Sequence, residues 1–424
     1  MKFGSPKEEH VRKVGGATTT TRLSTVLVVV MFVTTLQVIL SVYQAHNYLH
    51  QSPTTDNNNK FTVLHNVEAQ LHRFREEKNK ISKNEATGRA ELKHRNEETT
   101  SNTNPILEIL KDADIPITEE LASQIPPLSR VQQMYGDKPI VLGLERCENF
   151  RKNVDDPDRM TGPAGMFNSG TNLLFELIAA NCANVARLDK YKNGSAGIRF
   201  QVPWGKHSPA SYHDSHKTKT EKSLTERNFM PVVIIKDPYT WMQSLCRHSY
   251  SAEWKHKDDH CPNLIPNEVD TSKGFVQNEE HKQHLMTNGI PISIKYNPNT
   301  TLYNNMADAW NTWNREYIEA DIPRLVVRFE DLLLHAKSVI TDVCHCFGGT
   351  LINATHFQYI SESAKKAEHG HAGATKGFAE ALLLYTNSSN RIRSFTKEDL
   401  LFAKSALNQT MMEMLSYSIA SNSF

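Results

Sequence analysis

This chain has no large excess of positive or negative charge. Its 424 residues carry 48 Lys and Arg against 47 Asp and Glu, which leaves a formal net charge of +1. Proteins that bind nucleic acid attract its phosphates through a positive field. We therefore expect no nucleic-acid partner, and any attraction for an anionic ligand must be local.

Recognisable metal-binding spacings are also lacking. The histidines considered are His207, His213, His216 and His248, and no paired cysteines or third ligand at a typical distance accompany them. Cys344 and Cys346 would point apart on a helix. We predict no metal site, and we interpret the segment around His213 and His216 as a solvated loop.

The lysine of the common nucleoside-triphosphate motif is absent as well. Residues 165–172 read Gly-Met-Phe-Asn-Ser-Gly-Thr-Asn, and Gly165 and Gly170 have the separation that the motif requires. Thr171, however, stands where the motif demands lysine. Because that lysine neutralises the β and γ phosphates, its absence argues against ATP hydrolysis.

Two segments nevertheless have the chemistry of phosphate binding. The first is a turn of small residues that opens an apolar helix, so its backbone N–H groups can surround an anion; we expect Asn168, Ser169, Gly170, Thr171 and Asn172 to contribute. The second is the strand 232–236, which ends in Lys236 and is followed eight residues later by Ser244. Two such sites on one sheet predict a nucleotide that is phosphorylated at both ends.

These motifs resemble those of the sulfotransferases that use 3′-phosphoadenosine 5′-phosphosulfate (PAPS). Residues 168–171 resemble the family's 5′-phosphosulfate loop, and Lys236 with Ser244 resembles its 3′-phosphate motif. Residues 328–332, Arg-Phe-Glu-Asp-Leu, match a third family motif, and residues 395–400 and 414–417 resemble its closing helix. The resemblance covers about residue 139 to the C-terminus. Asn168 departs from it where many members have lysine, and Lys236 where arginine is frequent.

The resemblance also implies catalytic residues. Lys206-His207-Ser-Pro209 is similar to a Lys-Thr-His-Leu-Pro segment of the cytosolic branch, which makes His207 the candidate base and Lys206 the candidate charge stabiliser. Glycan-modifying branches use a glutamate instead, so Glu176 or Glu253 are alternatives, and a surface loop without a chemical role is another. Lys376, in a glycine-rich segment, is a candidate lid residue that reaches the 3′ phosphate.

The N-terminal part predicts a membrane anchor. Residues 23–43 contain no charged side chain and are long enough to cross a bilayer. Cations concentrate before this run, at Lys2, Lys7, Arg12, Lys13 and Arg22. The positive-inside rule then places residues 1–22 in the cytosol and the residues after the span in the lumen, so we expect a type II protein with a signal-anchor. The resemblance to carbohydrate sulfotransferases implies the Golgi membrane.

Residues 44–135 have the composition of a luminal stem, partly disordered or helical, before a catalytic domain at 136–424. A short apolar repeat at Leu64, Val67, Leu71 and Phe74 leaves a dimer through the stem possible, although a lone amphipathic helix is the simpler interpretation. Five glycosylation sequons, at Asn193, Asn299, Asn353, Asn387 and Asn408, fit a luminal glycoprotein.

All six cysteines lie on the predicted luminal side, where disulfide bonds persist. Fifteen complete pairings are possible. We prefer Cys246 with Cys261, because this bond would hold a polar excursion after the helix that carries Ser244. For Cys182, in an apolar helix, a buried thiol is an equal alternative.

Strands and helices alternate from residue 139 on, which predicts an α/β fold with a mostly parallel, P-loop-type sheet and helices on both faces. The clearest strands are 140–144, 197–202, 232–236 and 324–329, and the clearest helices are 172–183, 239–250, 306–320, 332–346 and 397–416. Ligands of such sheets bind at the C-terminal strand ends. Trp204, Tyr239, Trp241 and Trp254 are candidates for a sugar-stacking surface there.

Together these patterns predict transfer of a sulfuryl group from PAPS, without a metal, to a hydroxyl or amine of a glycan. Tyrosine on secreted proteins is an alternative acceptor with the same chemistry. Two other classes stay open: a catalytically silent glycan-binding or scaffold protein on the same fold, and a luminal P-loop kinase.

Overall fold

The structure is a computed structural model that describes residues 104–192, 196–215, 226–255, 257–296, 299–362, 364 and 377–420. These residues belong to one compact unit, Asn102–Phe424. The predicted tail, membrane span and most of the stem lie outside the described residues. Within the described part, no helix is both long and apolar enough to cross a membrane.

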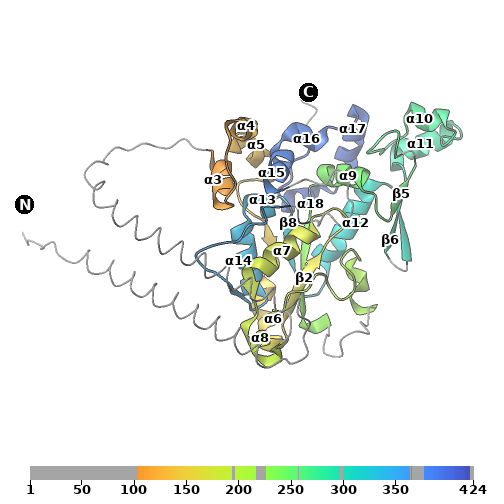
Figure 1. Cartoon of the computed structure of the whole chain (residues 1–424). Coiled ribbons are helices and arrows are strands. Elements are labelled where there is room, and N and C mark those ends of the chain that lie inside the picture. The colour runs from red at the N-terminus through yellow and green to blue at the C-terminus, as the bar shows by residue number, and fades with distance from the viewer. Residues whose placement is uncertain are drawn as a thin grey trace, which may run out of the picture. The chain divides into compact units, whose positions relative to one another are not determined.

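A four-stranded sheet forms the centre of this unit, in the order β1 (Val141–Leu142), β8 (Leu325–Arg328), β4 (Phe229–Ile235) and β2 (Met160–Ala164). Strands β8, β4 and β2 are parallel, and only β1 is antiparallel to its neighbour. Every residue of β2, β4 and β8 is buried, as expected for strands covered on both sides. The predicted mixed α/β fold with a mostly parallel sheet is therefore confirmed (Figure 1).

One predicted strand is wrong. Residues 197–202 form no strand, and only Ile198 makes an isolated parallel bridge, with Thr161 of β2. The segment still follows β2, because Arg199 N–H donates to the Thr161 carbonyl and Val202 N–H donates to the Pro163 carbonyl. A Cβ on Gly162 would lie 2.6 Å from the Arg199 carbonyl oxygen, so glycine in β2 permits this close approach.

The predicted helices are present with modified ends. Helices α7 (Thr171–Asn181), α9 (Pro238–Arg247) and α12 (Met306–Glu319) agree closely with expectation. The other two predicted helices are each divided, into α13 (Asp331–Leu334) with α14 (Ala336–Cys346), and α17 (Lys397–Ala406) with α18 (Gln409–Met414). The breaks fall at His335 and Leu407, whose backbones are not helical. Helix α7 packs on β2 and α13 packs on β8.

The segment before the sheet is folded, which differs from the predicted stem boundary at residue 135. It forms α3 (Pro105–Asp112), α4 (Glu119–Gln124) and α5 (Leu128–Tyr135). Its apolar residues join the main core, among them Ile106, Leu110, Met134 and Tyr135. Helices α3 and α5 bury only two or three residues each and α4 buries none, so the composition of this segment resembles that of a polar stem.

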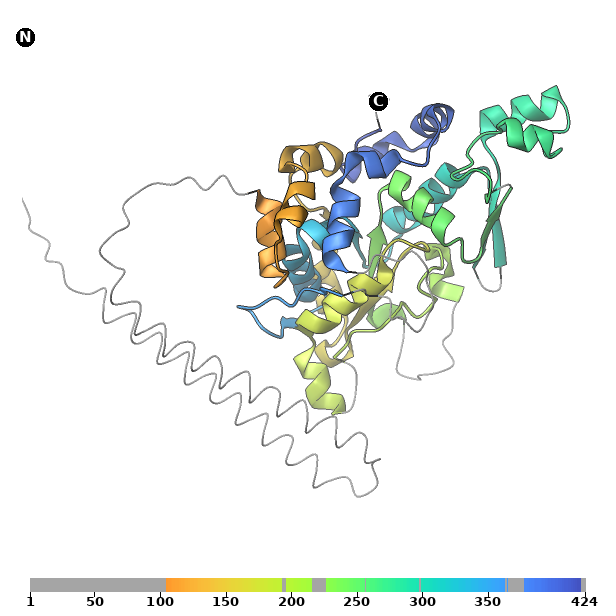
Figure 2. The same ribbon diagram turned by 45° about the horizontal axis from the view of Figure 1, so that its top comes forward.

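A small antiparallel sheet extends the unit on one side. Its strands are β5 (Ala252–Trp254), β6 (Ile292–Tyr296) and β7 (Asn299–Tyr303), and helices α10 (Glu268–Ser272) and α11 (Glu279–Asn288) lie beside it (Figure 2). The remaining elements are α6 (Cys147–Asn153), α8 (Val185–Tyr191), the paired β3 (Cys182–Ala183) and β9 (Thr350–Leu351), α15 (Phe378–Thr386) and α16 (Ser388–Ile392).

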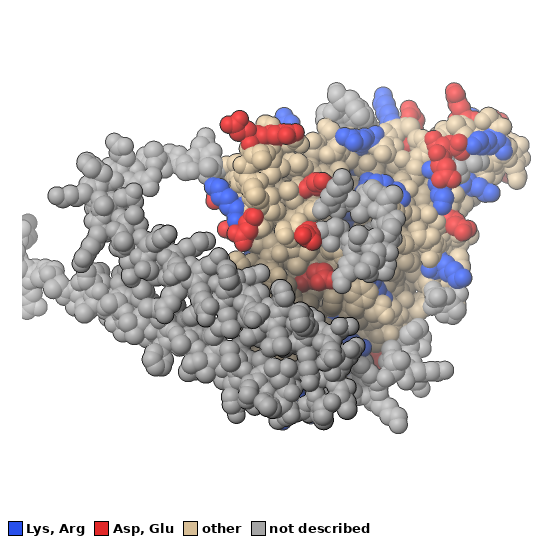
Figure 3. Space-filling model, viewed as in Figure 1, with Lys and Arg blue, Asp and Glu red and all other residues tan. Residues whose placement is uncertain are grey.

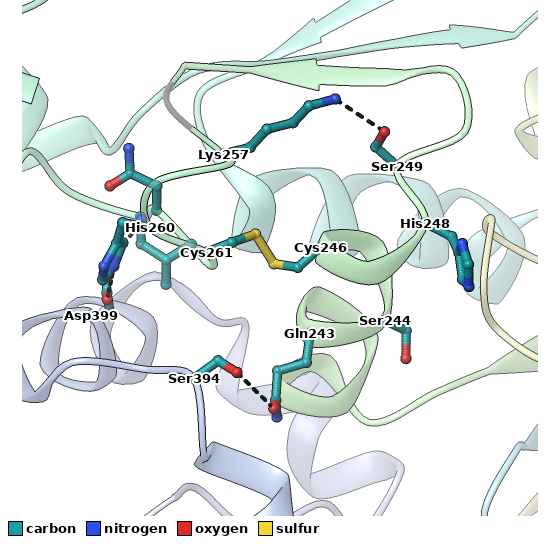
Figure 4. Close-up of a disulfide and its surroundings, with 12 residues drawn as sticks. Gln243, Ser244, Cys246, His248, Ser249, Lys257, His260, Cys261, Ser394 and Asp399 are labelled. Atoms are coloured by element: carbon teal, nitrogen blue, oxygen red, sulfur yellow. Dashed lines mark hydrogen bonds and ion pairs between the residues drawn. A yellow bond between two sulfur atoms is a disulfide. The ribbon is translucent and has the colours of Figure 1, made fainter. Parts of the chain in front are cut away.

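Three disulfide bonds cross-link the unit. The preferred pair Cys246–Cys261 is confirmed, and it closes the excursion that follows α9 (Figure 4). The thiol alternative for Cys182 is wrong, because Cys182 is bonded to Cys344. The third bond joins Cys147 to Cys346. Cys344 and Cys346 of α14 are thus bonded to two different elements, β3 and α6. This agrees with the expectation that their side chains point apart on the helix.

The surface charge is mixed. On the face shown in Figure 3, Lys and Arg side chains lie among Asp and Glu side chains over the described residues. This distribution agrees with the near-zero net charge of the whole chain.

Candidate functional site

The predicted phosphate-binding residues line one cavity of about 350 Å³ beyond the C-terminal ends of β2 and β4. Its lining includes Asn168, Gly170, Thr171, Asn172, Lys206, His207, Lys236 and Ser244. Ser169 is different: its side chain is buried, and its hydroxyl donates to the Met166 carbonyl. Lys376 lies outside the described residues. The structure therefore brings eight of the ten predicted site residues together.

The first loop places an open helix terminus at this cavity. Gly170 is the N-cap of α7, with φ of +100°, and it supplies no capping side chain. A Cβ there would lie 2.4 Å from the Phe329 ring, so only glycine fits both the backbone conformation and the space. The first-turn N–H groups of α7 thus carry the partial positive charge of the helix dipole beside the cavity.

Asn168 holds this loop to the next element. Its backbone is left-handed, with φ of +64°, and its amide donates to the His248 carbonyl at 2.8 Å. Asparagine tolerates this conformation better than most residues. The Asn168 amide thus holds the loop to the turn that follows α9.

Lys236 is a buried cation whose nearest partners are neutral. Its ammonium donates to Ser244 Oγ at 3.0 Å and to Tyr385 Oη at 2.7 Å, and only 3% of the residue is exposed. The rings of Phe329 and Tyr385 lie 4.5 and 4.2 Å from the ammonium. Burial lowers the pKa of Lys236, although the contacts with Tyr385 oppose this shift. An anion at this position would compensate the desolvated charge.

Ser244 and Arg247 continue the cationic end of the cavity along α9. Ser244 Oγ donates to the Thr240 carbonyl and accepts from Arg247 Nη2 at 2.9 Å as well as from Lys236. Arg247 also lines the cavity. Sequence reasoning missed Arg247, although its position one helical turn after Ser244 placed it on the same face of the helix.

A buried network of charged side chains holds the residues next to Lys236 in place. Asp237 caps α9 by accepting from Thr240 N–H, and the Arg391 guanidinium binds the same carboxylate with Nε and Nη2. Glu330 accepts from Asp237 N–H at 3.1 Å and from Tyr417 Oη at 2.8 Å. Burial, together with the Asp237 charge, raises the pKa of Glu330 to about 7. The strand end that carries Lys236 is thereby fixed.

The same network explains the Arg-Phe-Glu-Asp sequence at residues 328–331. Arg328 binds Asp331 through two hydrogen bonds of 2.7 and 2.6 Å and donates to the backbone carbonyls of Tyr135 and Leu415. Both charged side chains are buried, and a buried ion pair of this kind needs such additional partners. The motif is thus structural, except that the Phe329 ring lines the cavity.

Lys206 and His207 lie against the first loop. The Lys206 ammonium donates to Asn172 Oδ1 at 2.8 Å and lies 3.5 Å from the centre of the Phe200 ring. His207 Nδ1 is 2.7 Å from the Gly165 carbonyl oxygen. Because a carbonyl only accepts, Nδ1 carries the proton, and in the neutral ring Nε2 is the basic nitrogen. Trp313 Nε1–H donates to the His207 carbonyl and helps fix this segment.

The alternative residues lie elsewhere. Neither Glu176 of α7 nor Glu253 of β5 lines the cavity. The predicted sugar-stacking surface is wrong, because Trp204, Tyr239, Trp241 and Trp254 are all buried. They pack in the core, and the Trp241 indole N–H donates to the Phe167 carbonyl.

Other aromatic residues take the place of that surface at the cavity. Among these are Phe167, Phe200, Tyr250, Phe329 and Tyr385, which come from five separate parts of the chain. A local sequence pattern that marks them is lacking, since each belongs to a different loop or helix.

Comparison with known proteins finds no matching family model and no similar curated protein. The chemistry of the cavity is therefore argued from its own residues. The cavity combines the open N-terminus of α7, the buried Lys236 ammonium beside Ser244 and Arg247, and His207 with a basic Nε2.

Proposed function

We propose that this protein is a PAPS-dependent sulfotransferase with a P-loop-type sheet that helices cover on both faces. One observation carries the proposal: the small-residue loop at the start of α7 and the Lys236–Ser244 pair line the same cavity. Packed side chains between the two sites, or their placement on different faces, would have argued against a shared nucleotide.

The residues present fit a nucleotide with a phosphate at each end. The α7 terminus suits the 5′ phosphosulfate, because N–H donors and the helix dipole stabilise an anion there. The Lys236 ammonium and Ser244 hydroxyl suit the 3′ phosphate, and the Arg247 guanidinium is within reach of the same group. A Cβ at Gly170 would press on Phe329, whose ring lines the cavity.

PAPS supplies an activated sulfuryl group in this reaction. His207 Nε2 accepts the proton of the acceptor hydroxyl, since Nδ1 is held by the Gly165 carbonyl. The acceptor oxygen forms a bond to sulfur, and the bond between sulfur and the bridging phosphate oxygen breaks, with its electron pair leaving on phosphate. Lys206, which Asn172 and the Phe200 ring hold in place, stabilises the charge that develops on the leaving oxygen.

We further propose a Golgi type II membrane protein with a glycan acceptor. Three disulfide bonds support an oxidising compartment. Among the described sequons, Asn299, Asn353 and Asn387 are exposed, as glycosylation requires. Glycans are the abundant hydroxyl-bearing polymers of that compartment. The membrane helix and the possible dimer through the stem remain predictions from sequence.

Two other classes of protein fit the site less well. A luminal kinase needs a phosphate-binding lysine in the first loop, and Thr171 occupies that position. A silent glycan-binding protein would tolerate a histidine in any orientation, whereas the hydrogen bond of His207 with Gly165 selects a basic Nε2.

A transfer assay separates the three classes. The purified full-length chain is incubated with sulfur-labelled PAPS, or with labelled ATP, and a panel of glycans and tyrosine-containing peptides. Transfer from PAPS is expected, and His207→Gln should reduce its rate by about 100-fold or more, the contribution typical of a general base, while PAPS binding persists. Tight PAPS binding without transfer would instead favour the silent protein, and transfer from ATP the kinase.

A further inference from the structure

A row of aromatic rings begins beside the candidate base. The Phe167 ring lies 4.3 Å from the His207 ring, between centroids, and 5.5 Å from the nearly parallel Tyr250 ring. The Tyr296 ring is parallel to Phe167 at 6.5 Å and is buried beneath the row. Phe167, His207 and Tyr250 all line the cavity, and we call these three residues the aromatic row.

Tyr250 is the member of the row that faces solvent most, with 45% of its surface exposed. Its backbone has φ of +50°, a left-handed conformation that is rare for a bulky side chain. Such conformations cost on the order of 1–3 kcal/mol and persist where the surroundings enforce them, commonly at functional sites. An exposed aromatic ring held in a strained backbone points to a role beyond packing.

The turn that carries Tyr250 is fixed from several sides. The Asn168 amide donates to the His248 carbonyl, and the Lys257 ammonium donates to Ser249 Oγ at 3.1 Å. The disulfide between Cys246 and Cys261 closes the same excursion, as Figure 4 shows beside the Lys257–Ser249 contact. The ring is therefore positioned before any ligand arrives, which lowers the entropy cost of binding.

We propose that Tyr250 determines acceptor specificity by stacking on a sugar ring, which presents its hydroxyl to His207. This inference rests on the proposed sulfotransferase function. The negative face of an aromatic ring attracts the polarised C–H groups of a pyranose. The aromatic row carries no formal charge when His207 is neutral, so it suits an uncharged sugar unit better than a carboxylated or sulfated one. The open position of Tyr250 lets the rest of an oligosaccharide continue into solvent.

Saturation-transfer NMR tests this assignment on the full-length chain with adenosine 3′,5′-bisphosphate, the desulfated donor. The probes are neutral oligosaccharides that end in galactose, N-acetylglucosamine, mannose or fucose, with a chondroitin sulfate oligosaccharide and an acidic tyrosine peptide for comparison. We expect saturation of the C–H protons of one neutral sugar unit. Tyr250→Ala should reduce this signal and raise the acceptor KM by about tenfold, whereas Tyr250→Phe should retain both.

The matched control is Tyr191→Ala, which removes a comparably exposed tyrosine that does not line the cavity. Calorimetric binding of the bisphosphate should be unchanged in all three variants, which shows that they fold and bind the donor. Bisphosphate binding without saturation of any neutral sugar, or a sugar signal that Tyr250→Ala leaves intact, would overturn the inference alone. Failure of the unaltered chain to bind the bisphosphate would refute the proposed function itself.

Discussion

Replacing Lys236 by methionine should weaken binding of a 3′-phosphorylated nucleotide much more than binding of the same nucleotide without that phosphate. The ammonium contacts two neutral hydroxyls, of Ser244 and Tyr385, and is almost fully buried. A charge-assisted hydrogen bond is worth about 1.5–3 kcal/mol. At 1.4 kcal/mol per tenfold, the affinity for adenosine 3′,5′-bisphosphate should fall about 10- to 150-fold, with little change for AMP.

Isothermal titration calorimetry measures the loss of binding free energy for each nucleotide. The difference between the two losses is the coupling free energy between Lys236 and the 3′ phosphate. Methionine preserves the length of the side chain, so the cavity keeps its shape. Lys257→Met is the matched control, because Lys257 is a cation near α9 that does not line the cavity. Equal losses for the bisphosphate and AMP would remove the role assigned to Lys236.

The same titrations should show proton uptake. Burial lowers the pKa of Lys236, whereas a bound phosphate dianion would raise it. Bisphosphate binding to the unaltered chain should therefore take up protons, increasingly as the pH rises towards the lowered pKa. Buffers of different ionisation enthalpy measure this uptake, and it should disappear in Lys236→Met. Proton uptake that persists in Lys236→Met would show that another group takes up the proton.

Three further predictions concern the scaffold of the site. Burial and the Asp237 charge raise the pKa of Glu330 from 4.5 to about 7, so the folded state binds the extra proton and stability is lost as the pH rises. The free energy of unfolding should therefore drop by about 2 kcal/mol between pH 5.5 and 8. Denaturant titrations measure this drop, and it should be smaller in Glu330→Gln. Replacing Cys246 and Cys261 together by serine opens a loop with a sequence separation of 15 residues and should cost about 3 kcal/mol, measured in the same titrations; an unchanged midpoint would contradict this. Gly170→Ala places a Cβ 2.4 Å from a ring carbon at a φ of +100° and should lower stability by more than about 1 kcal/mol and abolish donor binding, whereas normal binding would show that the turn adapts.

Local sequence patterns predicted the part of the site that lies at strand and helix ends. Lys236 ends a fully apolar strand, and Gly170 opens an apolar helix, so both positions follow from the hydrophobic pattern. The C-terminal edge of a parallel sheet then brings the two together.

Long-range partners could not be predicted in the same way. Tyr385 contacts Lys236 across 149 residues of sequence, and Cys182 pairs with Cys344 across 162. For aromatic side chains the sequence led to a wrong prediction, because residues expected at the cavity surface are buried in the core. Trp241 lies on the helix of Ser244 yet packs inward, because large apolar side chains near a sheet fill the core first.

The helices that precede the sheet contact the part of the cavity that holds Lys236. Tyr135 of α5 donates its hydroxyl to the Tyr385 carbonyl at 2.8 Å, and the Tyr385 hydroxyl contacts Lys236. A shortened chain that starts at residue 136 would lose the hydroxyl donor to the Tyr385 carbonyl and one of the carbonyl partners of Arg328. The fold of the cavity wall that carries Tyr385 therefore depends on residues that precede the sheet.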